Sequence, residues 1–508
     1  MKRRLLAAVG IGAVIAALSA VTGQAQDAKS VLDAASKTLG AANLRSLQFS
    51  GWGFDYVFGQ RYDDNSPWPR FNLPGFTMTM DFVAPAIRDD RRRAQLEDPP
   101  LGGGFQPLFG EQRQIWAANG QHAWDVAGEN AVAARIRDDR RPTAQGRLEQ
   151  LWLTPQGFIK AAIAHNATAR VETVGGKKKT IVAFANPAGG RLEGTLNDRN
   201  EVEHIASWFG HNVLGDTTME AAFSDYKDFP STALGAGAVL KFPTRIVQRQ
   251  GGYPLLDVTV TDVKPNVAVS IDVPAHIPST PAGSIVGAPE KLADGIWIIP
   301  SYAKSVAVDF RDFIAVIEAP ETEAQSLQVI EAVRKVIPNK PIRYIINSHA
   351  HFDHLGGLRT YAAEGAAVIT HRDNVPFMQQ AWAQPRTIAP DRLSKSGKAA
   401  TFEGISGARM ISDGARTMVI YHYAGNMHNP GMLMVHFPKE KILVEADSFS
   451  PPAAPLTSPP NALPNLRHFY DSVQRLKLEV EQVVPIHGRL TTLAEAKGIL
   501  DTFSAGGR

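Results

Sequence analysis

The chain has 508 residues, 44% hydrophobic and 20% charged, so it can bury a core and is neither disordered nor fibrous. This length suggests two or three domains. Basic residues outnumber acidic ones by only 53 to 50, which gives no electrostatic footprint for nucleic acid, so we expect no nucleic-acid partner. Cysteine is absent, which excludes disulfides, thiolate metal sites and cysteine nucleophiles. Any metal must therefore be bound by His, Asp or Glu.

Residues 1–25 match the pattern of a secretory signal peptide. The basic residues Lys2–Arg4 precede an apolar run, Leu5–Leu18, and Gly23–Ala25 supplies the small residues of a cleavage site. As a helix the run extends roughly 21 Å, short of the about 30 Å of a bilayer core, which disfavours a membrane anchor. We predict cleavage after Ala25 and a periplasmic or secreted mature chain without a membrane span. Lys2–Arg4 account for the whole excess of positive charge.

Residues 26–285 carry a mostly strand-like pattern. The spacing predicts a helix over 31–39, and Asn119-Gly120 between two alternating runs predicts a hairpin. Thr154-Pro155 is typical of the cap and first turn of a helix, here extending to Ala164. Further strand pairs are predicted over 191–209 and 241–263. We expect a curved, half-barrel-like antiparallel sheet with a helix or two on its concave side.

The order of these elements, and segments such as 241–247, resemble periplasmic carrier domains of the lipoprotein-localisation type. The resemblance implies that the N-terminal domain holds an apolar ligand; a structural or substrate-orienting domain is the alternative. The hexapeptide Ile-Arg-Asp-Asp-Arg-Arg occurs at 87–92 and again at 136–141. Because mixed-charge clusters are usually solvated, we expect both copies to be loops without chemistry. Histidines scattered through this region, such as His211, are expected to pack or to face solvent.

The pattern changes after a proline-rich linker over 273–283, and we predict a second domain over 286–508. Apolar strands are predicted over 296–299, 313–317 and 342–346. Between the last two, Thr322 with Gln325 forms a capping-box pattern that opens an amphipathic helix. Alternating buried strands and amphipathic helices indicate a layered α/β domain.

The strand over 342–346 leads into Asn-Ser-His-Ala-His-Phe-Asp-His-Leu-Gly-Gly. This segment brings His349, His351, Asp353 and His354 to one strand-to-helix turn, which can direct them inward together. Two imidazoles at i and i+2 can bind one metal, and an adjacent carboxylate and imidazole can bind a second. The combination, followed by two glycines, is highly specific.

Three further candidate ligands each come just after an apolar strand. They are His428, Asp447 and His487. An α/β scaffold builds its site at such strand ends. Imidazoles and carboxylates favour zinc, although iron or manganese tolerate the same ligands.

These motifs resemble the metallo-β-lactamase superfamily over Val286–Arg508, which implies a four-layer αββα fold and a dinuclear metal site. The implied ligands are His349, His351 and His428 for one metal, Asp353, His354 and His487 for the other, and Asp447 as the bridge. The bridging carboxylate is similar to that of glyoxalase-II-like thioesterases and lactonases rather than of many true β-lactamases. Asn429 departs from the Thr or Ser that commonly follows the third motif's histidine.

We therefore expect an exported zinc hydrolase that uses a metal-bridging hydroxide to cleave an ester, lactone, thioester or amide of a small-molecule substrate. Asp353 is expected to orient the nucleophile and transfer its proton. Alternatives are a periplasmic carrier with a structural metal-binding domain, a β-lactamase proper, and a redox protein of the diiron type. Tyr302, Trp382, Arg386 and His468 are candidates to line the substrate pocket.

Overall fold

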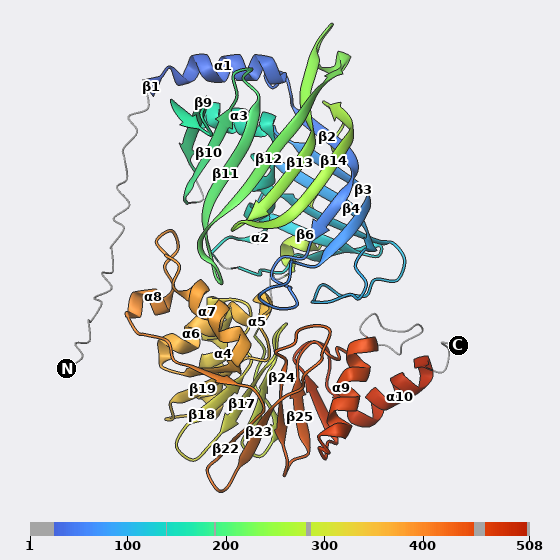
Figure 1. Cartoon of the computed structure of the whole chain (residues 1–508), viewed down its shortest axis with the longest axis vertical. Helices are drawn as coiled ribbons and strands as arrows, with labels where there is room; N and C mark the ends of the chain where they lie inside the picture. Colours follow the sequence, from blue (N-terminus) through green and yellow to red (C-terminus); the bar gives the residue numbers. More distant parts are fainter. Residues whose placement is uncertain (1–24, 139, 187–188, 281–285, 452–462, 505–508) are drawn as a thin grey trace, which may run out of the picture.

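Figure 1 shows the computed structural model, which describes residues 25–138, 140–186, 189–280, 286–451 and 463–504. The N-terminal part consists of one curved antiparallel sheet with its helices. In the view of Figure 1 it lies above the C-terminal part, which contains two sheets flanked by helices. Apart from Ala25, the predicted signal peptide lies outside the described residues. No helix in the described ranges is long and apolar enough to cross a bilayer.

The N-terminal part is built on a 14-stranded sheet in which every neighbouring pair is antiparallel. Its spatial order is β1-β8-β9-β10-β11-β12-β13-β14-β2-β3-β4-β5-β6-β7. The strands are β1 (Ala25–Gln26), β2 (Ser46–Tyr56), β3 (Arg70–Asp81), β4 (Ala86–Gln95), β5 (Gln112–Asn119), β6 (His122–Ala127), β7 (Asn130–Ala133), β8 (Thr168–Val174), β9 (Lys177–Ala185), β10 (Arg191–Leu196), β11 (Val202–His211), β12 (Gly215–Pro230), β13 (Val239–Gln250) and β14 (Tyr253–Pro265). The predicted hairpin at Asn119-Gly120 is confirmed, because β5 and β6 pair across it.

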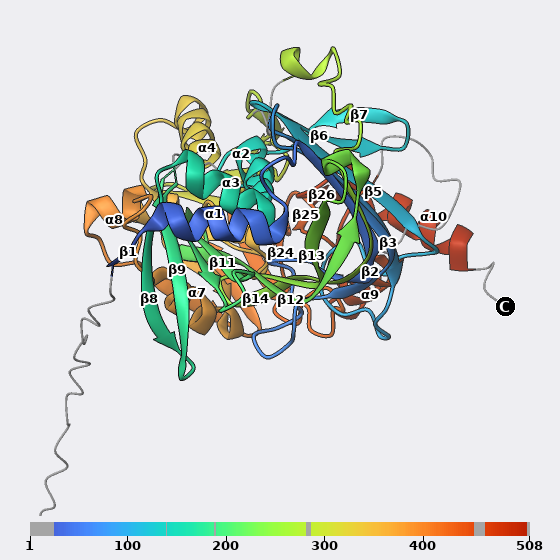
Figure 2. The same cartoon turned by 90° about the horizontal axis from the view of Figure 1, so that it is seen from above.

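Helices pack against the inner face of this sheet, and Figure 2 shows α1 lying across its end. The helical elements are α1 (Ala28–Leu39), α2 (Thr143–Leu148), η1 (Glu149–Leu151), α3 (Pro155–Ala164), η2 (Thr232–Leu234) and η3 (Ile277–Ser279). Thr154 caps α3 by accepting from the Gly157 amide, as the sequence predicts. Leu39 of α1, Phe158 of α3 and Phe242 of β13 are fully buried in one core, so apolar packing holds the helices on the sheet.

The C-terminal part contains a seven-stranded and a six-stranded sheet. The first has β15 (Glu290–Ala293), β16 (Ile296–Ile299), β17 (Ser305–Asp309), β18 (Ile314–Ile317), β19 (Ile342–Ile346), β20 (Ala367–His371) and β21 (Phe402–Ile405). The second has β22 (Ala408–Ser412), β23 (Thr417–His422), β24 (Leu433–Phe437), β25 (Ile442–Glu445), β26 (Gln482–Pro485) and β27 (Thr491–Thr492). The helical elements are α4 (Glu323–Val336), α5 (Phe352–Leu355), α6 (Leu358–Glu364), η4 (Arg372–Asn374), α7 (Val375–Trp382), α8 (Arg392–Ser396), α9 (Leu463–Arg475) and α10 (Leu493–Ser504).

Three apolar cores stack these elements into four layers. Between the sheets, Ile317 of β18 and Val444 of β25 belong to one core. Helices α4, α6 and α7 share a second core with the outer face of the first sheet, whereas α9 and α10 share a third with the second sheet. The predicted αββα arrangement is confirmed. The domain boundary at residues 285 and 286 stays a prediction.

The segment after α7 joins the two parts of the molecule. The buried Arg386 guanidinium donates to the main-chain carbonyls of His211, Asn212 and Val213 at 2.8–3.0 Å. Trp382 packs against Phe402, with ring centroids 4.9 Å apart. The expectation that Trp382 and Arg386 line the substrate pocket is wrong, because the first packs on a strand and the second binds the neighbouring part.

The first charged hexapeptide is not a solvated loop, so that prediction is wrong for this copy. The first lies in β4, where Arg91 pairs with Asp89 and with the fully buried Asp55. In the second copy, Asp138 accepts a hydrogen bond of 3.1 Å from the Asn212 amide. Burial raises the pKa of Asp138. The described residues of the second copy thus lie in a loop between β7 and α2, where Asp138 is paired within the fold while the Arg137 side chain is exposed.

Candidate metal centre

The structure brings all seven predicted ligands to one end of the two C-terminal sheets. The segment between β19 and α6 carries His349, His351, Asp353 and His354, and the three histidines are fully buried. The others lie where strands end: His428 between β23 and β24, Asp447 after β25, and His487 after β26. Asp447 adopts a φ of 60°, a left-handed conformation uncommon outside glycine, which turns the chain sharply after the strand.

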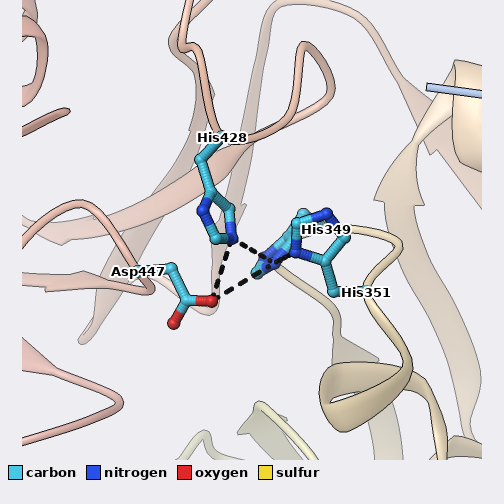
Figure 3. A group of neighbouring side chains, drawn as sticks. All are labelled: His349, His351, His428 and Asp447. Atoms are coloured by element: carbon cyan, nitrogen blue, oxygen red, sulfur yellow. Dashed lines mark hydrogen bonds and ion pairs between the residues drawn. The ribbon is translucent and has the colours of Figure 1, made fainter. Parts of the chain in front are cut away.

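His349, His351, His428 and Asp447 form a first group of converging ligand atoms (Figure 3). His349 Nε2 lies 3.0 Å from His351 Nδ1 and 3.3 Å from His428 Nε2. Asp447 Oδ2 lies 3.0 Å from His428 Nε2. These atoms are close enough together to bind one ion.

Asp353, His354, His487 and the same Asp447 form a second group. His354 Nε2 lies 3.3 Å from Asp447 Oδ2 and 3.7 Å from Asp353 Oδ2. His487 Nε2 lies 3.3 Å from Asp447 Oδ1. Asp447 thus belongs to both groups, the arrangement that the sequence resemblance implies for a bridging ligand.

Acceptors on the outer side of three imidazoles fix where their ring protons lie. His351 Nε2 donates to the Arg61 carbonyl at 2.9 Å, and His354 Nδ1 donates to Glu318 Oε2 at 2.8 Å. His487 Nδ1 donates to the Tyr302 carbonyl at 3.0 Å. Because a carbonyl or carboxylate can only accept, the inner nitrogen of each of these rings presents a lone pair whenever the ring is neutral.

The ionisation of these groups suits a cation between them. Burial lowers the pKa of His349 well below its usual range and that of His351 to about 3, which keeps both imidazoles neutral. Burial opposes ionisation of Asp353, but His354 and His487 outweigh it and lower the pKa of Asp353 to about 2. Burial would also lower the pKa of His354, yet Asp447, Asp353 and Glu318 together raise it well above its usual range.

Asp447 Oδ1 is buried and has no hydrogen-bond partner among the described residues. Converging lone pairs beside an unpartnered carboxylate oxygen are costly unless a positive ion lies among them. The residues present therefore fit metal binding.

A loop of the N-terminal part, residues 57–62 between β2 and β3, contacts the metal-ligand segment directly. Gln60 Nε2 donates to Asp353 Oδ1 at 2.7 Å, beside the Arg61 carbonyl contact to His351. Asn429, the departure noted in the third motif, donates through Nδ2 to the Tyr62 carbonyl at 2.8 Å. The sequence gives no local signal for these contacts, because their partners lie hundreds of residues apart.

A cavity of about 530 Å³ opens onto the centre. Its walls include Asp353, His428, Asp447 and His487, the apolar side chains of Val57, Phe105, Phe449 and Leu466, and two arginines, Arg135 and Arg137. Tyr302 lines the cavity, as predicted. His468, another candidate, instead donates through Nε2 to the Ala424 carbonyl at 2.9 Å.

The sequence model of the metallo-β-lactamase superfamily matches residues 315–487, a stretch that contains all seven candidate ligands and ends at His487. The C-terminal domain belongs to the metallo-β-lactamase superfamily. Its fold, its His/Asp groups and this match together support a metal-dependent enzyme of the hydrolase class.

A curated relative of this superfamily domain is the 2,4-dinitroanisole O-demethylase subunit alpha of Nocardioides sp. (strain JS1661), which is 25% identical over 173 residues. The match covers 34% of this chain and 47% of the relative, so the chain spans about half of the relative's length.

Two solved structures are similar to the superfamily domain. A metallo-β-lactamase from Pontibacter korlensis is 18% identical with a TM-score of 0.33, over 42% of this chain and 96% of the other. The metallo-β-lactamase FIM-1 from Pseudomonas aeruginosa is 18% identical with a TM-score of 0.32, over 43% of this chain and 94% of the other.

Proposed function

We propose that the chain is an exported dinuclear zinc hydrolase that cleaves an ester, lactone, thioester or amide bond of a small-molecule substrate. The observation that carries the proposal is the pair of converging ligand groups that share Asp447, a residue that also lines the cavity. Imidazole and carboxylate ligands without thiolates favour zinc, and iron or manganese are the alternatives.

His349, His351 and His428 would hold one ion, Asp353, His354 and His487 would hold the other, and Asp447 would contribute to both groups. Such ions would supply Lewis acidity and a hydroxide nucleophile near neutral pH. Asp353 faces the cavity while Gln60 fixes its Oδ1, so its carboxylate can orient the attacking water and accept its proton. Glu318, Arg61 and Tyr302 hold three imidazoles in the tautomer that binding requires.

Export is proposed from the signal-peptide pattern of residues 1–25. An enzyme of the cell envelope must keep its shape without disulfides here, since the chain has no cysteine. Fractionation of cells that produce the full-length chain, with the N-terminus of the mature protein sequenced, tests this. Cleavage after Ala25 is the expected result, and an intact N-terminus in the cytoplasm would refute export.

Metal content and turnover, measured together on the purified protein, test the proposed activity. We expect two ions per chain and hydrolysis of at least one class in a panel of esters, lactones, thioesters and lactams. The panel also includes 2,4-dinitroanisole, because the matched relative is named for its O-demethylation. Asp353→Ala should abolish the turnover, whereas His204→Ala, on the N-terminal sheet, should not affect it. Absence of stoichiometric metal, or full turnover by Asp353→Ala, would refute the proposal.

The carrier hypothesis rests on a second cavity, of about 630 Å³, in the N-terminal part. Its walls carry Phe82, Leu148, Trp152 and Ala161, which suit an apolar ligand. Lipid that co-purifies with the protein and is lost in Ala161→Trp would support a carrier function beside the hydrolase. An extract free of lipid would count against it.

A further inference from the structure

Two arginines of the N-terminal part, Arg135 and Arg137, line the cavity above the metal centre. Among the described lining residues the acidic ones are Asp353 and Asp447, both of which are candidate metal ligands. Bound cations would offset these two carboxylates. The charge that remains on the cavity wall is then the positive charge of the arginines.

Arg135 is held rigidly next to the metal centre. Its Cζ lies 3.3 Å from the centre of the Tyr302 ring, and that ring lies 4.7 Å from the imidazole of His487. Its Nε also lies 2.9 Å from Oε2 of the buried Glu321, an ion pair without hydrogen-bond geometry. These two contacts restrict the guanidinium, so less side-chain entropy remains to be lost when a ligand binds.

Arg137 differs from Arg135 because its side chain is exposed and forms no ion pair with a described residue. Its backbone is nevertheless fixed, since Asn212 Nδ2 donates to the Arg137 carbonyl at 3.1 Å. The same Nδ2 donates to the Glu321 carbonyl at 2.7 Å. One asparagine thus connects the Arg137 segment to the residue that holds Arg135, which keeps both arginines at one wall of the cavity.

The remaining cavity wall combines apolar side chains with neutral polar ones such as Gln106 and Asn465. Val57 and Phe105 contribute from the N-terminal part, and Phe449 and Leu466 from the C-terminal domain. Phe105 is 76% exposed, so much of its ring faces solvent. An apolar wall beside two arginines matches a ligand with an apolar body and an acid group.

We propose that the cavity selects substrates that carry a carboxylate, bound by Arg135 and Arg137, while the scissile bond lies over the metal centre. A guanidinium presents paired N–H donors in the geometry that a carboxylate accepts, and a partly buried site strengthens the pair. This inference rests on the proposed hydrolase function for the reaction itself, but acid binding can be measured without turnover.

Isothermal titration of the purified full-length mature protein with 4-phenylbutyrate and with 4-phenylbutanamide tests the proposal. The two probes share the apolar body and differ in charge. We expect the acid to bind more tightly than the amide, and Arg137→Ala to weaken acid binding about tenfold while amide binding stays within about twofold. Arg135→Lys keeps the positive charge but loses the paired N–H donors of the guanidinium. It should weaken acid binding less than Arg135→Ala does. Arg113→Ala, which removes an exposed arginine on β5, is the matched control.

Equal binding of acid and amide by the native chain would overturn the proposal. Equal weakening of both probes by Arg137→Ala would also overturn it, because it would show that Arg137 contributes bulk rather than charge. Metal content is measured on every variant. This distinguishes weaker acid binding caused by a lost metal ion from weaker binding caused by the missing arginine. Acid-selective binding in a protein that hydrolyses nothing would refute the proposed activity and leave the acid site standing.

Discussion

The side-chain amide of Gln60 donates a hydrogen bond of 2.7 Å to Asp353 Oδ1, although the two residues belong to different parts of the molecule. Asp353 is the carboxylate expected both to bind metal and to take the proton of the attacking water. A residue of the N-terminal part therefore positions the group on which the proposed chemistry depends. The N-terminal part thus forms one wall of the candidate metal centre.

Gln60→Leu should reduce metal affinity at the second ligand group, together with turnover, by about tenfold, because outer hydrogen bonds to a ligand typically contribute 10- to 100-fold. Gln60→Asn should give a smaller loss if its shorter amide still reaches Asp353. Metal titration and steady-state kinetics on the same preparations check both effects. Gln121→Leu, an exposed glutamine on the turn after β5, is the control. Unchanged metal affinity and turnover in Gln60→Leu would show that the contact is incidental.

Substitution of Asp447, which belongs to both ligand groups, should release more metal than substitution of a ligand that belongs to one group. We expect Asp447→Asn to release most of both ions, whereas His351→Ala should release one and leave the second group occupied. Elemental analysis after dialysis gives the stoichiometry. Chelation of the native chain should lower its free energy of unfolding, by about 2.7 kcal/mol for each ion that had been present at 100 times its Kd. Retention of one full ion in Asp447→Asn would contradict a bridging role.

Local signals in the sequence predict the elements and the ligand set, but not the contact between the two parts. Thr154 and Thr322 each cap the helix expected from their neighbours, because a cap depends on residues three positions away. The Gln60 contact depends instead on how two folded surfaces meet, and no periodicity encodes that. The same reason explains why Arg386 does not line the pocket as expected. From the sequence alone, an arginine that binds a substrate cannot be distinguished from one that donates to the carbonyls of a neighbouring part.

Arg386→Ala should destabilise the protein by about 3 kcal/mol, because it leaves the carbonyls of His211, Asn212 and Val213 without their buried donor. Burial lowers the pKa of Arg386 to about 10, so its guanidinium remains charged at neutral pH. Urea unfolding at pH 7.5 measures the loss. Arg392→Ala removes an exposed ion pair with Glu364 and should change stability by less than about 1 kcal/mol. Similar stability of the two variants would show that Arg386 does not hold the parts together.

The interface histidine His211 should make the protein sensitive to mild acid. Its Nδ1 accepts from the amides of Val213 and Leu214, both at 3.1 Å, and therefore must stay unprotonated. Burial first, and then Arg386, Arg140 and Arg141, lower the pKa of His211 from 6.5 to about 3. Between these two values the unfolded chain binds the proton and the folded chain does not. Stability contributed by His211 is thus fully present above pH 6.5 and is lost as the pH falls toward 3.

His211→Gln keeps an acceptor for both amides and removes the titrating ring. At pH 4.5 the native chain should have lost roughly 2–3 kcal/mol more of its free energy of unfolding than His211→Gln, since each pH unit corresponds to about 1.4 kcal/mol. Chemical unfolding at pH 7.5, 6.0 and 4.5 measures this difference, and acid release of metal affects both proteins alike. His204→Gln, a more exposed histidine on the same strand β11, should retain the acid sensitivity of the native chain. If His211→Gln lost stability in acid as steeply as the native chain, protonation of His211 would not be the cause.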